Sequence, residues 1–153
     1  MKLNTRVRYA IRMMADIAKH CSEKPVPLRD VAERQGLSKL YLSQLATPLR
    51  NAGLLRSVWG NKGGYVLARA ANEINLLEIM EAVDGSVSII ECAENPETCD
   101  RAAYCETLAV WRNINEAITG VLRKYTLQDL TEMAPERNAK DAMACFPDSA
   151  RPS

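Results

Sequence analysis

Residues 28–49 read LRDVAERQGLSKLYLSQLATPL. Apolar residues at helical spacing predict a first helix at Leu28–Gln35, which Gly36 can end by taking the left-handed conformation. Ser38 is a favourable N-cap for a second helix, whose buried side would hold Leu42, Leu45, Ala46 and Leu49. Pro48 predicts a kink or an early end in that helix. Two short helices joined by a tight turn with glycine are typical of a helix-turn-helix.

The residues on either side extend this unit. Apolar residues at i, i+3, i+4 and i+7 predict an amphipathic helix at residues 5–21, capped by Asn4 or Thr5. After the second helix, two strand-like runs, Leu54–Trp59 and Tyr65–Ala68, flank the glycine-rich loop 60–64. A β-hairpin directly after a helix-turn-helix predicts a wing, with Trp59 at its base.

The second half of the chain predicts a loop and a long helix. Asn75 is expected to cap a helix near residues 76–83, which Asp84 and Gly85 end. Residues 86–104 read as a long irregular loop, and residues 102–125 as a long helix. The apolar stripe of this helix is too large for one small core and therefore predicts a partner surface; it consists of Leu108, Trp111, Ile114, Ile118, Val121, Leu122 and Tyr125.

The predicted fold class is mainly α. A winged helix-turn-helix DNA-binding domain with a small β-hairpin occupies residues 1–70, and residues 71–132 contain the loop and a long dimerisation helix. A last short turn is expected at residues 126–133, and the polar tail at 133–153 is predicted to be disordered.

The charges are divided unevenly along a chain whose formal net charge is +1. Residues 1–70 contain thirteen Lys and Arg against four Asp and Glu, a charge of +9, while residues 71–153 carry −8. This asymmetry predicts that the first half meets a polyanion. The sequence contains no apolar run long enough for a membrane span and no apolar signal core near residue 1, so we expect a cytoplasmic protein without a membrane partner.

The expected contacts to double-stranded DNA lie on the second helix and the wing. With the leucines facing inward, polar side chains that can bond base edges or phosphate face outward, and Leu40 can pack on a thymine methyl group. The candidate residues are Ser38, Lys39, Leu40, Tyr41, Ser43, Gln44, Trp59, Asn61 and Lys62. For Tyr41 and Trp59, ordinary packing against the domain is an equally good interpretation.

Three of the five cysteines have a spacing that suggests a cofactor. They read Cys92-x6-Cys99-x5-Cys105, which is wider than the tight pairs of structural zinc sites and suits an iron–sulfur cluster. Cys105 near the start of the long helix would have its thiolate favoured by the helix dipole. A thiol–disulfide switch, a zinc site and unrelated cysteines stay open as alternatives. Cys21 is expected in the core and Cys145 in the tail.

The sequence resembles the IscR/NsrR-like family of iron–sulfur winged helix-turn-helix transcriptional regulators. The resemblance covers residues 1 to about 130 and is carried by Leu3, Arg8-Tyr9-Ala10, Pro25-Val26-Pro27-Leu28, Ala32-Glu33-Arg34-Gln35-Gly36, Tyr41-Leu42, Gly63-Gly64-Tyr65, the three cysteines and Trp111-Arg112. It implies a homodimer on a palindromic DNA operator, with the long helices at the dimer interface. It also implies that a 2Fe–2S or 4Fe–4S cluster on Cys92, Cys99 and Cys105 controls operator affinity in response to iron–sulfur status, redox change or nitric oxide.

Several positions depart from the family pattern. Some members have a histidine three residues after the last cysteine, where this chain has Leu108, and others use a carboxylate from the partner's first helix, where it has Arg8. The resemblance therefore leaves the fourth ligand open between Glu106, a residue of the partner chain and a small exogenous thiol. Six residues separate Cys92 from Cys99, where the family members have five. Ser43 and Trp59 replace an acidic residue and a wing arginine, so the preferred DNA site is expected to differ.

The sequence thus predicts a DNA-binding transcriptional regulator, acting as a repressor, and not an enzyme. No Cys–His pair lies near the cysteine motif, and the Gly63-Gly64 pair lacks the spacing of a phosphate-binding loop. The alternative is a cluster-free thiol-redox sensor of the same fold. A protein–protein adaptor whose basic half meets an acidic partner is a further alternative.

Overall fold

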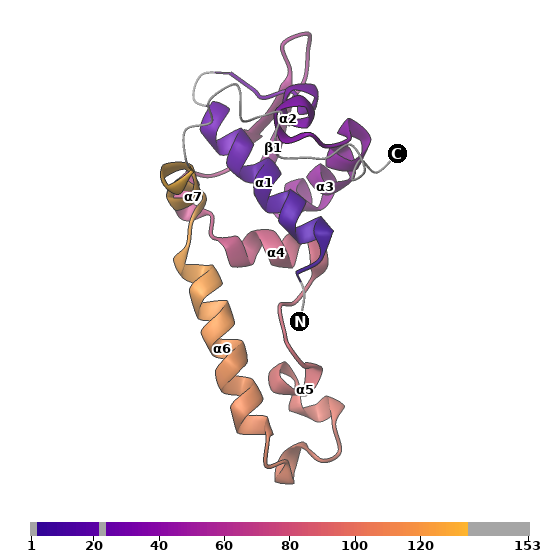
Figure 1. Cartoon of the computed structure of the whole chain (residues 1–153). Helices are drawn as coiled ribbons and strands as arrows, with labels where there is room; N and C mark the ends of the chain where they lie inside the picture. Colours follow the sequence, from indigo (N-terminus) through magenta and orange to yellow (C-terminus); the bar gives the residue numbers. More distant parts are fainter. Residues whose placement is uncertain (1–2, 22–23, 135–153) are drawn as a thin grey trace.

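The computed structural model describes residues 3–21 and 24–134, and within them the fold is mainly helical with one small β-hairpin (Figure 1). The upper body holds the first four helices, the hairpin and the last helix, while α6 and the segment before it extend below. The elements are α1 Thr5–His20, α2 Leu28–Gln35, α3 Lys39–Asn51, β1 Leu55–Val58, β2 Gly64–Leu67, η1 Ala71–Glu73, α4 Leu76–Asp84, α5 Glu91–Glu94, η2 Pro96–Thr98, η3 Ala102–Tyr104, α6 Leu108–Lys124 and α7 Leu127–Met133.

The helix starts and stops follow the local chemistry. The side chain of Asn4 accepts a hydrogen bond from the N–H of Val7 at 2.8 Å, and that of Ser38 caps α3. Gly36 takes φ 64° and ψ 39°, the left-handed conformation that ends α2. These three predictions are confirmed. Of the two outcomes predicted at Pro48, the early end is wrong, because α3 continues to Asn51, and the kink stays a prediction. Pro48 has no N–H to donate to the carbonyl of Gln44, so the helix loses one hydrogen bond. The loss falls in the last turn of the helix, where it is tolerated.

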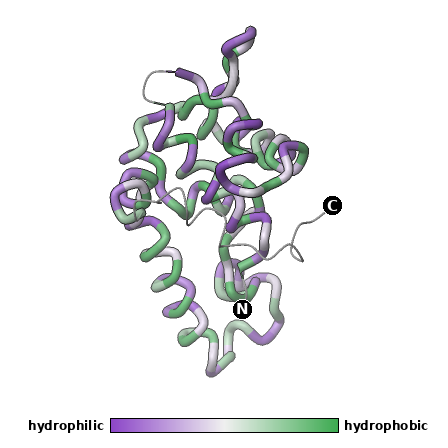
Figure 2. The backbone as a smooth tube through the Cα atoms, turned by 45° about the horizontal axis from the view of Figure 1, so that its top comes forward, coloured by the Kyte–Doolittle hydropathy of each residue, from purple (hydrophilic) through white to green (hydrophobic). Residues whose placement is uncertain are grey.

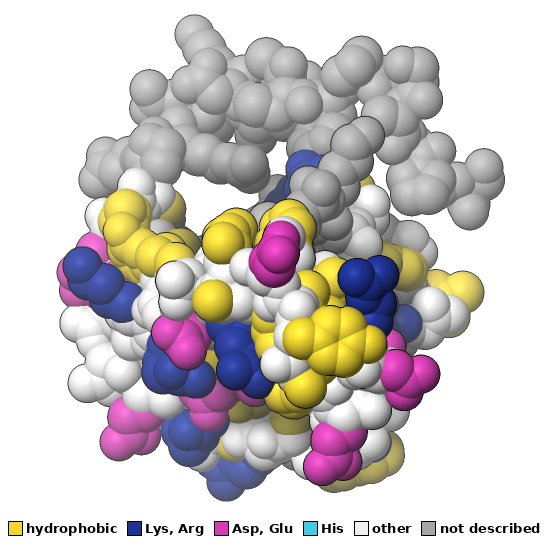
Figure 3. Space-filling model, turned by 90° about the horizontal axis from the view of Figure 1, so that it is seen from below, with side chains coloured by type: hydrophobic (Ala, Val, Ile, Leu, Met, Phe, Trp, Pro, Cys, Tyr) yellow, Lys and Arg dark blue, Asp and Glu magenta, His cyan; other side chains and the backbone are white. Residues whose placement is uncertain are grey.

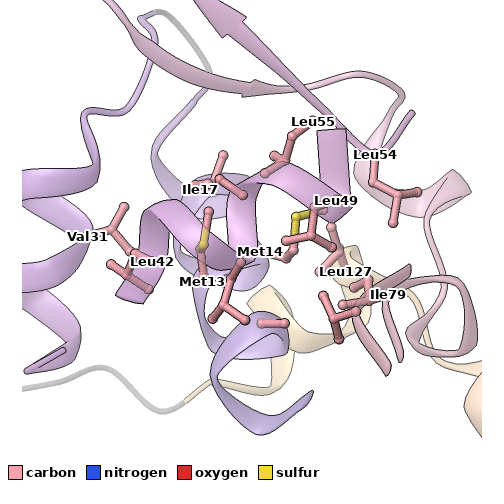
Figure 4. Close-up of a cluster of buried hydrophobic side chains, with 14 of the residues drawn as sticks. Met13, Met14, Ile17, Val31, Leu42, Leu49, Leu54, Leu55, Ile79 and Leu127 are labelled. Carbon is pink, nitrogen blue, oxygen red and sulfur yellow. The ribbon is translucent and has the colours of Figure 1, made fainter. Parts of the chain in front are cut away.

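One hydrophobic core joins the N-terminal helices to α4 and α7 (Figure 4). Met13, Met14 and Ile17 of α1 are fully buried, and Leu42, Leu45 and Leu49 of α3 complete the helix-turn-helix side of the core. Ile79 of α4 and Leu127 of α7 belong to the same cluster. Burying each such side chain stabilises the fold by about 1.5–3 kcal/mol. The core therefore fixes α3 against the elements that lead to α6.

The hairpin pairs β1 with β2 in antiparallel register, from Leu55 opposite Leu67 to Val58 opposite Gly64. Val26 and Tyr65 exchange two backbone hydrogen bonds of 2.9 and 2.8 Å, which attach β2 to the connection after α1. β1 ends one residue earlier than predicted. Trp59 therefore lies in the turn at the tip of the wing and not at its base.

The segment between α4 and α6 is more structured than predicted. Three short turns, α5, η2 and η3, replace the irregular loop, and none of them has a buried residue. The predicted start of the long helix at Ala102 is wrong, since α6 begins at Leu108. Tyr104 is 68% exposed and Cys105 is extended, at φ −81° and ψ 113°. Because no side chain of residues 102–107 is buried, another helical turn there has little to stabilise it.

Division of the chain into domains at residue 70 stays a prediction. Cys145 and the predicted disordered tail beyond Ala134 lie outside the described residues. Within those residues, no helix is long and apolar enough to cross a membrane.

Candidate functional site

The outward face of α3 is polar and open. Four of its residues are exposed, namely Ser38, Lys39, Leu40 and Gln44. Leu40, the hydrophobic residue among them, is 71% exposed. The opposite face is fully buried in the core. The periodicity of the sequence therefore placed these residues on the exposed side of the helix, and their contacts to DNA stay a prediction.

Two of the α3 candidates have side chains already engaged within the protein. The hydroxyl of Ser43 donates a hydrogen bond to the carbonyl of Lys39 at 3.1 Å, which leaves its oxygen lone pairs as the outward-facing group. Tyr41 is half-buried and packs edge-on against Tyr9, with ring centroids 5.9 Å apart at 89°. The Tyr41 ring therefore packs within the protein, and its contact to DNA stays a prediction.

The remaining DNA candidates lie on the wing. Trp59, Asn61 and Lys62 are all exposed, and Trp59 is 90% exposed. The interpretation in which Trp59 packs against the domain is wrong, because the residue follows the last strand pair and is almost fully exposed. The wing tip thus offers one large aromatic side chain and one cation to solvent.

A buried carboxylate that the sequence analysis did not single out holds α1 against α2. The side chain of Asp16 is 3% exposed and accepts hydrogen bonds from Arg34 at 2.6 Å and from Gln35 at 2.8 Å. Arg12 in turn donates to the side chain and carbonyl of Gln35. The hydrogen bond to Asp16 is the main cause of the raised pKa of Arg34. Asp16 lies outside the apolar i, i+3, i+4 stripe of α1, so helical periodicity did not indicate that it is buried.

The three candidate ligand cysteines lie on successive turns of the segment 86–107. Cys92 is in α5, Cys99 follows η2 and Cys105 follows η3; each is half-buried and none forms a disulfide. Across the described part of the chain, no group of three or more Cys, His, Asp or Glu side chains is arranged to hold a metal ion. The sequence therefore brings the thiols to one segment, but the structure does not gather them.

The donor set nevertheless fits an iron–sulfur cluster in its chemistry. Three thiols are the ligands that such clusters use, and the turns that carry them have no residue locked in the core. The hydroxyl of Thr107, 3.4 Å from the Cys105 sulfur, and the Thr107 backbone N–H lower the pKa of that thiol. Leu108, at the position where some relatives have a histidine, is buried.

The cysteine segment is attached to α6, and α6 is attached to the upper body. The side chain of Asn115 accepts the backbone N–H of Ile89 at 3.2 Å, and α5 packs on α6. At the other end of α6, the N–H of Leu76 donates to the carbonyl of Tyr125 at 3.0 Å, and α7 packs on α1. A continuous set of contacts therefore runs from the cysteine turns to the helix-turn-helix.

Part of the apolar surface of α6 is exposed in the described part of the chain. Figure 2 shows hydrophobic residues recurring along the whole helix, and Figure 3 shows hydrophobic side chains among charged ones at the lower end of the molecule. Leu108 and Leu122 turn toward the protein, whereas Val110, Trp111, Ile114 and Val121 are between 36% and 55% exposed. The exposed positions Val110, Ile114, Ala117 and Val121 have the 4-3-4 spacing of a helix-pairing seam.

Comparisons with known proteins agree with this architecture. Residues 3–133 match the family model of Rrf2, described as an iron-dependent transcriptional regulator. The HTH-type transcriptional regulator IscR of Photorhabdus laumondii is 45% identical over 130 residues, which are 85% of this chain and 79% of that protein.

Two solved structures are also similar. CymR, the global cysteine regulator of B. subtilis, has a TM-score of 0.74 and 35% identity, covering 88% of this chain and 99% of its own. The structure of IscR from T. potens has a TM-score of 0.71 and 34% identity, covering 92% and 96%.

Proposed function

This chain belongs to the Rrf2 family of transcriptional regulators, and we propose that it is a homodimeric repressor whose affinity for a palindromic operator is controlled by an iron–sulfur cluster on Cys92, Cys99 and Cys105. One observation carries the proposal. Three half-buried thiols occupy a segment that is attached to α6, and α6 leads to the helix-turn-helix. Either cluster type, 2Fe–2S or 4Fe–4S, needs a fourth ligand; exposed Glu106 and a residue of the partner chain are the candidates on the protein, and a small exogenous thiol is the alternative.

The proposed DNA contacts combine α3 and the wing. In this proposal Gln44 and Ser43 bond base edges, Lys39 contacts phosphate and Leu40 packs on a thymine methyl group. Ser38, Tyr41, Trp59, Asn61 and Lys62 complete the predicted set. Support comes from the basic charge of residues 1–70 and from the exposed face of α3.

The proposed switch acts through the attachment of the cysteine segment. The cluster, when bound, supplies redox and ligand-exchange chemistry at three thiolates. Asn115 and the α5–α6 contact then transmit the state of the segment to α6, and the backbone bonds at Leu76 and Leu127 transmit it to the core. A coupling free energy of about 1–3 kcal/mol is typical of such two-site systems.

The proposed dimer uses the exposed seam of α6. Introducing a carboxylate with Val121→Glu is expected to give monomers, because the charge would be desolvated between two helices. Asn113→Glu adds the same charge at an exposed polar position of α6 and is expected to leave the dimer intact. Light scattering after size-exclusion chromatography measures both. A monomeric wild type, or a dimeric Val121→Glu variant, would reject this interface.

The cluster is tested on protein purified without oxygen. We expect visible absorbance, an electron-paramagnetic signal in one redox state, and iron and sulfide in stoichiometric amounts. Cys92→Ala is expected to lose them and to change DNA affinity. Cys21→Ala is the matched control, because Cys21 is equally half-buried but lies at the end of α1. Colourless, iron-free wild-type protein whose DNA affinity does not respond to Cys92→Ala would refute the mechanism.

A cluster-free thiol sensor is the second candidate. Two observations favour it, namely the similarity to CymR and the absence, among the described residues, of gathered metal ligands. In that case the protein would be isolated without iron, and its DNA affinity would change reversibly with a thiol oxidant. The change would disappear in Cys92→Ala or Cys105→Ala but not in Cys21→Ala.

A further inference from the structure

The tip of the wing carries a large hydrophobic side chain that the protein leaves in water. Trp59 is 90% exposed, the highest value among the exposed large hydrophobic residues of the described chain, and its neighbour Val58 is 40% exposed. Tryptophan is normally highly buried, since its side chain can remove roughly 150–250 Å² of surface from water. Together with exposed Val58, this tryptophan at the end of a projecting hairpin (Figure 1) forms an apolar surface that is available to a binding partner.

The wing holds this side chain on a rigid support. Gly60 takes φ 116°, and the N–H of Gly63 donates to the carbonyl of Gly60 at 3.0 Å, which closes the turn. A Cβ atom on Gly63 would collide with the carbonyl oxygen of Val58, so the turn is packed on itself. One strand pair away from the turn, Tyr65 exchanges two backbone hydrogen bonds with Val26, which attach the hairpin to the connection after α1. Little conformational entropy is therefore lost when the tip meets a partner.

The charges around the tip favour a polyanion as that partner. Arg56 and Lys62 are exposed on the hairpin, and residues 34–72 contain no Asp or Glu at all, although they contain six Lys and Arg. This acid-free region includes both α3 and the wing. Proteins that bind the minor groove of DNA often insert an apolar side chain between base pairs and contact the groove with neighbouring Arg and Lys.

We propose that Trp59 is an apolar wedge that enters the minor groove next to the major groove occupied by α3, bends the duplex there, and selects sites with an easily deformed base step. The inference rests on the proposed DNA binding and adds a specificity-determining residue to it. Trp59 makes no base-specific hydrogen bond beyond its single N–H, so the selection acts through deformability. Pyrimidine–purine steps such as TA and CA are the most readily unstacked and are expected under the wing.

The experiment uses the full chain and a 30-base-pair duplex that the wild-type protein enriches from a random pool. Trp59→Ala is expected to weaken binding roughly tenfold to a hundredfold, the loss typical of removing aromatic stacking on a base. Energy transfer between dyes on the two DNA ends reports the bend, which we expect to decrease in this variant. Replacing the pyrimidine–purine step under the wing should lower the affinity of the wild-type protein for the duplex but not that of Trp59→Ala.

Two further variants separate the wedge from general attraction. Lys62→Ala is expected to lower affinity for all duplexes and to reduce the salt dependence by about one phosphate contact, with the bend unchanged. The chain has two tryptophans, so in Trp59→Phe only Trp111 of α6 remains, and the fluorescence quenching that DNA causes in the wild type should be lost. Equal affinity, bend and step preference for wild type and Trp59→Ala would overturn the wedge and leave DNA binding intact. Enrichment of no duplex by the wild type would reject both.

Discussion

Replacing the buried carboxylate of Asp16 by alanine tests whether the α1–α2 network holds the helix-turn-helix together. The carboxylate accepts from Arg34 Nη2 at 2.6 Å and Nε at 3.1 Å, and from Gln35 Nε2 at 2.8 Å. Alanine removes this acceptor and leaves the charge of Arg34 beside an apolar surface. The hydrogen bonds that fix the angle between α1 and α2 are then lost. The position of α3, which packs on both helices, is expected to be less well defined.

The expected cost follows from burial on the two sides of the pair. Removing one member of a fully buried ion pair costs about 3–5 kcal/mol. The Asp16 side chain is 3% exposed but that of Arg34 is 35% exposed, so water can solvate part of the remaining charge. We therefore expect a loss of about 2–3 kcal/mol in the free energy of unfolding. For a chain of this size the melting temperature would fall by about 4–12 °C.

Urea unfolding followed by far-UV circular dichroism at one fixed protein concentration measures this loss. Asp30→Ala is the control, since Asp30 is 38% exposed and pairs at the surface with Arg29; its cost should stay below about 1 kcal/mol. A double-mutant cycle with Arg34→Met should show a coupling of at least about 1 kcal/mol. The reasoning is refuted if Asp16→Ala costs no more than Asp30→Ala, or if the two single losses simply add.

Three other outcomes are expected. Gly64→Ala should displace the wing and weaken DNA binding in a gel-shift assay while the helices still form, because a Cβ there would lie 2.5 Å from the backbone of Val26. Leu127→Ala should cost about 2–5 kcal/mol in urea unfolding, since the side chain is fully buried. Burial acts to raise the pKa of Glu78, but its hydrogen bonds from Arg69 and the Asn75 N–H lower it on balance, and the Thr126 N–H and hydroxyl lower that of Asp129. A lowered carboxylate pKa stabilises the folded state above the ordinary values of 4.5 and 3.8, and this contribution is lost as the pH falls through the lowered values. Unfolding midpoints measured from pH 7 to 3 should show that loss, and Glu78→Gln should reduce it.

Local signals in the chain were sufficient for most element boundaries. Caps at Asn4, Ser38 and Asn75 and the left-handed Gly36 act within one helical turn, so neighbouring residues alone specify them. The face of α3 that points outward followed from its leucine spacing for the same reason. Where the prediction depended on distant packing it was less accurate, as at Ala102, where no buried side chain supports the helical turn that the composition favours.

By itself, the sequence determined the winged helix-turn-helix, the basic character of its surface and the position of three thiols on one segment, because these depend on residue type and on short spacings along the chain. Tertiary structure alone decided that Asp16 is buried against Arg34, that Trp59 stands free at the wing tip, and that one side of α6 stays uncovered. Each of these depends on which elements meet in space, and a side chain's exposure is set by neighbours far away in the sequence.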